Sequence, residues 1–183
     1  MKIAALVADG FEEIELISVI DLLRRAEIKT EIWGLNQLQF SGGHNIKLIA
    51  DKIFPPGNST EIDGLFLPGG KQGVENLVNS PPVLNLIENL YNKQKWLVAI
   101  CAAPFVLETA GVLQGKTVTI YPGWESKLIT AARVVNQPVV IDGKIVTSRG
   151  VGTALELGLT LCRLWCGQDQ ADYLASAILY DQR

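Results

Sequence analysis

Short runs of Val, Ile and Leu alternate with helical patterns along most of this sequence, and this alternation limits the fold more than any other feature. The first run, residues 2–7, stops just before Asp9, which is typical of a strand followed by a turn. In residues 12–26 the apolar positions fall mostly on one side of a helix that begins with acidic residues and ends with Arg24 and Arg25. Strands that alternate with helices imply a largely parallel sheet covered on both faces. We therefore expect a doubly wound α/β sandwich.

The rest of the chain continues this pattern. Gly42 and Gly43 mark the turn of a hairpin that we expect to project from the sheet, and Asp142 with Gly143 marks a second hairpin. Further strands are expected at 30–35, 62–67, 96–100 and 117–120, hairpins at 39–50 and 139–148, and helices at 73–78, 82–93, 103–110, 152–165 and 169–180.

Composition favours one domain covering residues 1–183, because 48% of the side chains are hydrophobic and no linker or repeat interrupts them. The net charge is −3 without a dense Lys/Arg cluster, so no nucleic-acid partner is expected. The most apolar long window, 96–113, is broken by Pro104 and Glu108, so no membrane span is expected. The first apolar run is too short for a signal segment, and three cysteines make no disulfide framework. We expect free thiols and a cytoplasmic protein.

Ligands of open α/β sheets collect at the carboxyl ends of the strands, so the residues that follow each strand are the candidates for a site. Cys101 stands between an expected buried strand and a helix, where a sharp turn can present a nucleophilic sulfur. A helix N-terminus favours the thiolate, so we expect the pKa of this thiol to be lowered. Core packing is the alternative for any cysteine in an apolar setting. The candidate segments are 9–15, 68–70, 101–104, 121–123 and 149–150.

Three further positions could support a reactive sulfur. Gly69 and Gly70 either allow a backbone turn that would strain other residues, or they direct an N–H group near Gly70 toward the sulfur. Together with the N–H group of Ala102, that donor would stabilise an oxyanion. Glu15 lies in the apolar part of the first helix, where burial favours the protonated acid. A protonated Glu15 can donate a hydrogen bond to a neighbouring thiolate.

Four segments stand in a fixed order along the chain: Glu-Glu-Ile-Glu at 12–15, Leu-Pro-Gly-Gly at 67–70, Ala-Ile-Cys-Ala-Ala-Pro at 99–104 and Thr-Ser-Arg-Gly-Val-Gly-Thr at 147–153. In this order they resemble the motifs of the DJ-1/ThiJ/PfpI superfamily, and the sequence looks like its DJ-1 and YajL branch. The resemblance implies a flavodoxin-like fold, a cytoplasmic homodimer, and no metal or organic cofactor. It implies that Cys101 is the reactive cysteine of a nucleophile elbow with Glu15 as its protonated partner. It also implies that Gly70 and Ala102 supply the oxyanion donors.

Two departures from the resembling proteins narrow the chemistry. PfpI-type proteases place His directly after the nucleophilic cysteine, where this chain has Ala102, so protease activity is not expected. DJ-1-like proteins described as glyoxalases place His where this chain has Tyr121, and a phenol is a poor general base near neutrality. Glutamine amidotransferases need a His-x-Glu pair late in the chain, but the sole histidine is His44. That class is excluded.

The remaining candidates have two interpretations each. Gly69, Tyr121 and Arg149 are expected at the substrate pocket, although Arg149 could equally form a structural ion pair. Cys162 and Cys166 have the spacing of half a metal site, but without a second pair of ligands we expect them to pack in a buried helix.

His44 lies on the first hairpin and is ordinarily an exposed turn residue. Because the resembling proteins use this arm at the dimer interface, we predict that His44 lies over the Cys101 of the partner subunit. Glu12 and Glu13 are expected to be solvated partners of the helix dipole.

These observations suggest two main functions. In the first, Cys101 adds to reactive carbonyls on small compounds or modified proteins, which is a cofactor-independent glyoxalase or deglycase activity in stress protection. In the alternative, the protein is a non-catalytic oxidative-stress sensor or chaperone that works through oxidation of Cys101. A thiol that is merely tolerated remains a third interpretation.

Overall fold

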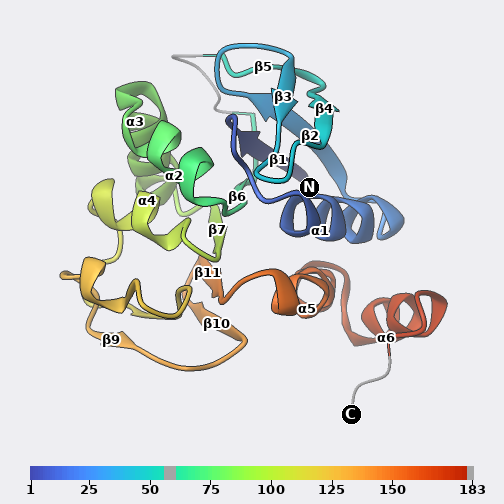
Figure 1. Ribbon diagram of the computed structural model, residues 1–183. Coiled ribbons are helices and arrows are strands. Elements are labelled where there is room, and N and C mark those ends of the chain that lie inside the picture. The colour runs from blue at the N-terminus through green and yellow to red at the C-terminus, as the bar shows by residue number, and fades with distance from the viewer. Residues whose placement is uncertain (56–60, 181–183) are drawn as a thin grey trace.

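The computed structural model describes residues 1–55 and 61–180, and its centre is a seven-stranded sheet (Figure 1). The strands lie in the order β10-β11-β7-β6-β1-β2-β5, and all neighbours are parallel except β10 and β11. Because β2 and β6 lie on opposite sides of β1, the chain reverses its winding direction there, as expected for a doubly wound fold. The strands are β1 Lys2–Val7, β2 Lys29–Gly34, β5 Lys52–Ile53, β6 Gly64–Leu67, β7 Trp96–Ile100, β10 Val139–Asp142 and β11 Ile145–Ser148.

Alternate residues of β1 face opposite layers, since successive side chains of a strand point to opposite sides of the sheet. Ile3, Ala5 and Val7 belong to one buried cluster, while Ala4 and Leu6 belong to the other. Helices cover both clusters, which gives the expected flavodoxin-like sandwich of three layers (Figure 1). On the first face lie α1 Glu13–Arg25, α5 Ala154–Cys166 and α6 Gln168–Ala177, and on the second lie α2 Lys71–Val78, α3 Pro81–Asn92 and α4 Pro104–Thr109.

The first hairpin forms a separate two-stranded sheet of β3 Gln39–Ser41 and β4 Lys47–Ile49. It is held against the loop after β1, because Gly10 donates its N–H to the carbonyl of Ser41 at 2.8 Å and Gly43 donates to Phe11 at 2.8 Å. The hairpin therefore lies outside the central sheet, as predicted, and beside the beginning of α1.

The strand expected at 117–120 is shorter than predicted and does not join the central sheet. Instead β8 Thr117–Val118 pairs with β9 Arg133–Val134 in a separate two-stranded sheet. The reason is that β11 pairs directly with β7 and the antiparallel β10 closes that edge, so no place remains for β8. Within 1–55 and 61–180, no helix has both the length and the apolar character needed to cross a membrane.

Candidate active site

Cys101 occupies a strained turn between β7 and α4. Its φ of 62° lies in the left-handed region, which residues other than glycine rarely adopt. The conformation is held from both sides, because the N–H of Cys101 donates to Ser148 at 3.0 Å and its carbonyl accepts from Tyr121 at 2.9 Å. Such a conformation costs about 1–2 kcal/mol and persists only where neighbours fix it. The turn holds the half-buried thiol at the carboxyl edge of the sheet, as the sequence predicts.

Two glycines allow the backbone to approach the sulfur. A Cβ atom at Gly69 would lie 2.5 Å from Cys101 Cβ and 3.1 Å from its Sγ, so no larger residue fits. Gly70 has a φ of 90°, and a Cβ there would collide with the carbonyl oxygen of Gly10. The backbone N–H groups of Ala102 and Gly70 are near enough to the sulfur to lower the pKa of the thiol. The sequence-predicted donors therefore lie at the thiol.

Glu15 is completely buried on α1, and its Oε2 accepts the N–H of Gly69 at 2.8 Å. Its Oε1 has no hydrogen-bond partner among the described residues. Burial raises the pKa of this carboxyl to about 7, with a smaller upward contribution from the charge of Glu12, while the Gly69 donor and the Cys101 side chain oppose the shift. At neutral pH, Glu15 is therefore divided between the acid and the carboxylate.

The expectation of a lowered thiol pKa is wrong for Cys101. Burial, then the charge of Glu15 and the hydrogen bond with Glu15, raise the pKa of the thiol to about 12. The donors at Ala102 and Gly70 lower it, as the sequence argument assumed, but they are outweighed. The helix terminus and the donors favour the thiolate, but the desolvation of the sulfur, which the residue pattern does not reveal, outweighs them. Cys101 therefore rests as a thiol beside a carboxyl group that can take its proton.

The loop after β11 forms another wall of the site. A Cβ at Gly150 would lie 3.3 Å from the ring of Tyr121 and 3.8 Å from Glu15 Oε1. Thr153 holds this loop, because its hydroxyl accepts the N–H of Gly150 at 3.1 Å and lies 2.7 Å from the hydroxyl of Ser148. This role of Thr153 is not predictable from the motif at 147–153, since nothing in the residue pattern identifies the hydroxyl pair.

Arg149 is half-buried beside Gly150, and its backbone N–H donates to Pro138 at 3.3 Å. No ion pair joins its guanidinium to another residue in 1–55 or 61–180. The structural ion pair considered for Arg149 is therefore absent from the described part of the chain.

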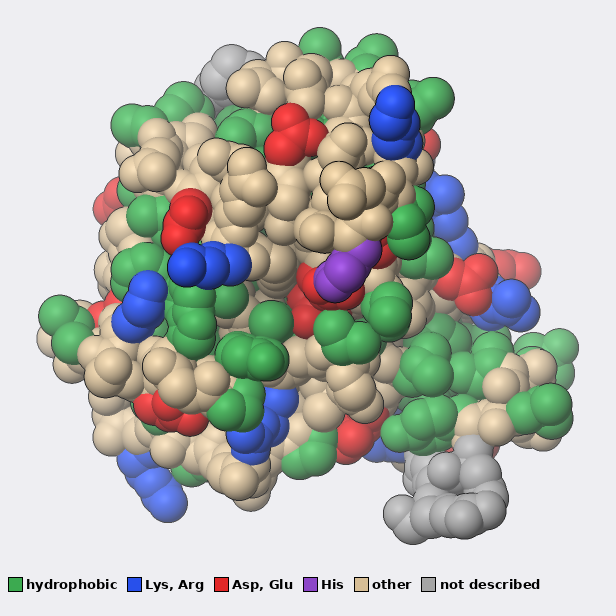
Figure 2. Space-filling model, viewed as in Figure 1, with side chains coloured by type: hydrophobic (Ala, Val, Ile, Leu, Met, Phe, Trp, Pro, Cys, Tyr) green, Lys and Arg blue, Asp and Glu red, His purple; other side chains and the backbone are tan. Residues whose placement is uncertain are grey.

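His44 lies over the beginning of α1 in its own chain (Figure 2). Its Nδ1 is 3.1 Å from Glu13 Oε2 and 3.7 Å from Glu12 Oε2, and the hydrogen bond with Glu13 followed by both charges raises the pKa of the imidazole. The expectation of a solvated Glu13 is wrong, because Glu13 is buried under the hairpin. Its Oε1 accepts the N–H groups of His44 and Ile46. The three side chains could each offer a metal ligand atom within 4.8 Å of the others, but these hydrogen bonds and ion pairs already account for the grouping.

Cys162 and Cys166 face the α1 side of α5. Cys162 is buried, with its Sγ 3.6 Å from the carbonyl oxygen of Leu22, while Cys166 is exposed, with its Sγ 3.9 Å from that of Ala26. In the described ranges neither belongs to a group of possible metal ligands. Cys162 packs between the two helices as expected, but Cys166 does not share that burial.

A doubly wound sheet with a strained cysteine after a central strand, faced by a buried glutamate, defines an α/β protein of the nucleophile-elbow type. Residues 1–164 match the DJ-1/PfpI family, and the chain belongs to that family. It is 34% identical to Protein DJ-1 homolog B of Arabidopsis thaliana over 175 residues, which are 94% of this chain but only 40% of that protein. The chain thus spans about two fifths of that relative.

Two further similarities cover most of both proteins. The crystal structure of Drosophila melanogaster DJ-1beta superposes with a TM-score of 0.94 at 32% identity, covering 98% of each chain. A protein of Pyrococcus horikoshii that is named a deglycase is 33% identical over 150 residues, which are 81% of this chain and 90% of that protein. These similarities agree with the fold and the family that the sequence motifs indicate.

Proposed function

We propose that this protein uses Cys101 to act on reactive carbonyl groups, on small compounds or on modified proteins, without a metal or organic cofactor and in the cytoplasm. The observation that carries the proposal is that four groups lie together. They are the thiol of a residue with a strained backbone, two backbone N–H groups and a buried carboxyl with an unpartnered oxygen. The similarity to a protein named a deglycase supports it.

The chemistry begins with the addition of the thiol to an aldehyde. Glu15, whose pKa is about 7, takes the thiol proton as the sulfur–carbon bond forms and the carbonyl π bond opens. The N–H groups of Ala102 and Gly70 stabilise the oxyanion, which then takes up a proton to give a hemithioacetal. Because the thiol proton moves to Glu15 during the addition, the raised pKa of Cys101 does not prevent the reaction.

A 2-oxoaldehyde such as methylglyoxal can then rearrange without an external oxidant. Glu15 would take the proton from the former aldehyde carbon and return a proton to the neighbouring carbon, while the proton of the new hydroxyl passes to the neighbouring oxygen. The hemithioacetal thereby becomes a 2-hydroxy thioester. Water then breaks the sulfur–carbon bond and releases a 2-hydroxy acid and the free thiol. One carbon is oxidised and its neighbour is reduced, so aldehyde plus water balances the 2-hydroxy acid.

Three neighbouring residues would complete the substrate pocket. Gly69 keeps space open beside the sulfur, and Tyr121 contributes an aromatic wall that is 47% exposed. Arg149 has no ion pair in the described ranges and would attract an anionic substrate group.

The test is steady-state lactate production from methylglyoxal by the wild type and by Cys101→Ser, without glutathione. Turnover by the wild type that disappears in the variant is the expected result. Absence of turnover in both proteins would reject the enzymatic proposal and favour the sensor described next.

A non-catalytic redox role is the second candidate, and the unpartnered Glu15 Oε1 favours it. A protonated Glu15 could hydrogen-bond a sulfinate on Cys101 and retard further oxidation. Mild peroxide should then yield mainly the sulfinate in the wild type, as seen by mass spectrometry, and a broader mixture in Glu15→Ala. Identical products in both proteins would reject this role for Glu15.

Homodimer formation is part of the proposal. Ile14 and Ile17 on α1 are 54% and 47% exposed, and Leu155 on α5 is 41% exposed. Hydrophobic side chains also gather over the α1 and α6 side of the face in Figure 2. Contiguous exposed apolar surface of this kind marks interaction sites. In such a dimer His44 would lie nearer the partner's Cys101 than its own, and a dimer structure tests that placement.

A further inference from the structure

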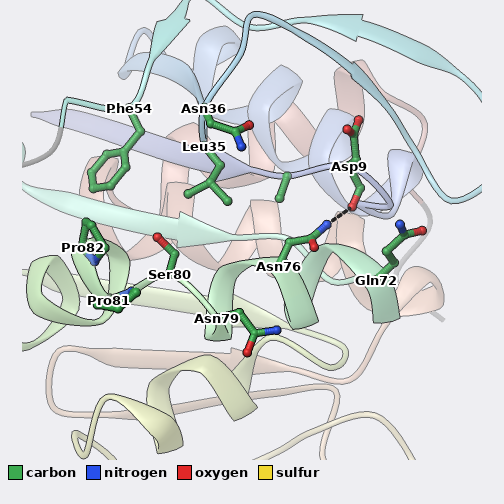
Figure 3. Close-up of a pocket in the computed structure, with 11 residues that line it drawn as sticks. Asp9, Leu35, Asn36, Phe54, Gln72, Asn76, Asn79, Ser80, Pro81 and Pro82 are labelled. Carbon is green, nitrogen blue, oxygen red and sulfur yellow. Dashed lines mark hydrogen bonds between the residues drawn. The ribbon is translucent and has the colours of Figure 1, made fainter.

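A second cavity, of about 660 Å³, lies at the carboxyl ends of β1 and β2 and is bounded by α2 and the start of α3 (Figure 3). Neither Cys101 nor Glu15 lines it. Its volume falls within the range of about 300–1,000 Å³ that small-molecule sites occupy. Because the doubly wound fold places ligands at this edge of the sheet, the cavity is a candidate binding site independent of the thiol.

The charges around this cavity limit what it can bind. Asp9 is the one charged residue that lines it, and no Lys, Arg or His from 1–55 or 61–180 does so. Both carboxylate oxygens of Asp9 are engaged, accepting the N–H of Ser41 and the side-chain amide of Gln37, each at 2.8 Å. A phosphate or carboxylate ligand would find no cation here, and one engaged carboxylate is a poor cation site. The lining therefore favours a neutral ligand.

Neutral hydrogen-bonding groups dominate the polar lining. Asn76 donates its amide to the carbonyl oxygen of Asp9 at 3.0 Å, as the dashed line in Figure 3 marks. The side chains of Asn36, Asn79 and Ser80 make no hydrogen bond to protein groups in the two described stretches of the chain. A side-chain amide offers two donors and a carbonyl acceptor, and a hydroxyl offers both functions. Such groups match adjacent hydroxyls on a ligand.

The other part of the lining is apolar. In Figure 3, Phe54 and Leu35 lie on the rim that also carries Asn36, and Ser80 with Pro82 lies opposite. Phe54 is buried and its ring stacks on Trp33, so it supports the lining from below. Leu35 is half-buried and Pro82 is exposed, and these two side chains can cover the C–H face of a sugar ring while the amides bind its hydroxyls. A purely polar or purely apolar ligand would use only half of this lining.

We propose that this cavity binds a neutral polyhydroxylated compound, either a sugar or a sugar alcohol. Its hydroxyl groups pair with Asn36, Asn79 and Ser80, and its C–H surface lies against Leu35 and Pro82. The proposal is independent of the carbonyl chemistry at Cys101, because neither Cys101 nor Glu15 lines this cavity.

The experiment is a ¹H–¹⁵N NMR titration of the labelled protein with D-glucose, D-glucitol and glucose 6-phosphate. We expect saturable shifts at the side-chain amides of Asn36 and Asn79 with a neutral compound, and weaker binding of the phosphate because of Asp9. Asn36→Ala and Asn79→Ala should each weaken binding about five-fold, the effect of one lost hydrogen bond. Asn89→Ala, an exposed asparagine of α3 outside the cavity, is the matched control and should bind as the wild type does.

Three results would overturn the proposal: no saturable shift with glucose or glucitol, equal binding by Asn79→Ala and the wild type, or tighter binding of glucose 6-phosphate than of glucose. A neutral dipeptide amide that saturates the same signals when both neutral compounds fail would identify a peptide site instead. Methylglyoxal turnover by Asn79→Ala is measured in parallel and should equal that of the wild type, so failure at one site is distinguishable from failure at the other.

Discussion

Among single residues, the proposed function depends on how Glu15 and Cys101 share protons. Burial raises the pKa of both groups, Glu15 to about 7 and Cys101 to about 12. The carboxyl is therefore the group that titrates near neutrality, and in the proposed mechanism it takes the thiol proton only as the sulfur–carbon bond forms. This arrangement suits general-base chemistry at neutral pH, because an efficient base has a pKa close to the working pH.

Replacing Glu15 with Gln should make stability less dependent on pH. The pKa of Glu15 in the folded protein, about 7, lies above the ordinary value of 4.5, so the contribution of protonated Glu15 to stability is fully present below about pH 4.5. This contribution is lost as the pH rises to about 7. The loss is about 3 kcal/mol in the free energy of unfolding. Relative to the wild type, Glu15→Gln should therefore gain up to that amount between those pH values.

Urea unfolding across this pH range checks the expectation. The control is Glu88→Gln, an exposed carboxylate on α3 without an ion pair in the described ranges. The free energy of unfolding of Glu88→Gln should differ from that of the wild type by the same amount at every pH. A flat difference for Glu15→Gln as well would mean that Glu15 is not buried as described.

Alkylation of Cys101 should be slow at neutral pH and still increase above about pH 9, because the thiolate is disfavoured by burial and by the charge of Glu15. Glu15→Gln removes that charge and should move the profile to lower pH. Iodoacetamide labelling resolved by mass spectrometry measures this, with the exposed Cys166 as an internal reference for the reagent. A plateau at Cys101 near neutrality would instead indicate a preformed thiolate.

At the scale of secondary structure elements, the site depends on close approaches between turns. Gly69→Ala would place a Cβ 2.5 Å from both Cys101 Cβ and Glu15 Oε2, so these groups must move apart. We expect a loss of about 2 kcal/mol or more in the free energy of unfolding, together with loss of carbonyl turnover.

Gly152→Ala is the matched control for that substitution. A Cβ at Gly152 meets nothing within 4 Å, so its stability should remain within about 0.5 kcal/mol of the wild type. Thermal unfolding of both variants gives the comparison. Equal stabilities for the two variants would contradict the packing described around Gly69.

Strands and helices with a clear hydrophobic period can be predicted from the sequence more accurately than short edge strands or the burial of single polar side chains. β1 and β7 are recovered to the residue, because each is an apolar run long enough to show its period. β5, with two residues, is too short for any pattern, and the pairing of β8 with β9 depends on competition for a sheet edge. Likewise, Glu15 is recognisable as a carboxyl in an apolar helix face, whereas the burial of Glu13 depends on a hairpin distant in the sequence.

At the scale of the whole molecule, parallel winding brings the ends of β6, β7 and β11 to one edge, where they meet the start of α1. The exposed apolar residues of α1 lie beside this edge and adjoin a groove of about 390 Å³ lined by Ile17, Leu155 and Ile178. This surface is the face that we expect a second copy to cover.

The double substitution Ile14→Glu and Ile17→Glu should convert a dimer into a monomer, because it places two charges in an apolar interface. Light scattering with size-exclusion chromatography measures the mass. Ile129→Glu, at a residue that is 83% exposed on a different part of the surface, should leave the mass unchanged. A monomeric wild type, or dissociation by the Ile129 variant, would contradict the assigned face.

Our main proposal is that Glu15 exchanges a proton with Cys101 during carbonyl chemistry, and the pH dependence of methylglyoxal turnover measures that exchange. We expect kcat/KM of the wild type to rise with an inflection near pH 7, the pKa of Glu15. In Glu15→Gln turnover should fall by about 100-fold or more and that inflection should vanish, while Glu88→Gln keeps the wild-type profile. An unchanged profile in Glu15→Gln, or full turnover by Cys101→Ser, would contradict the claim.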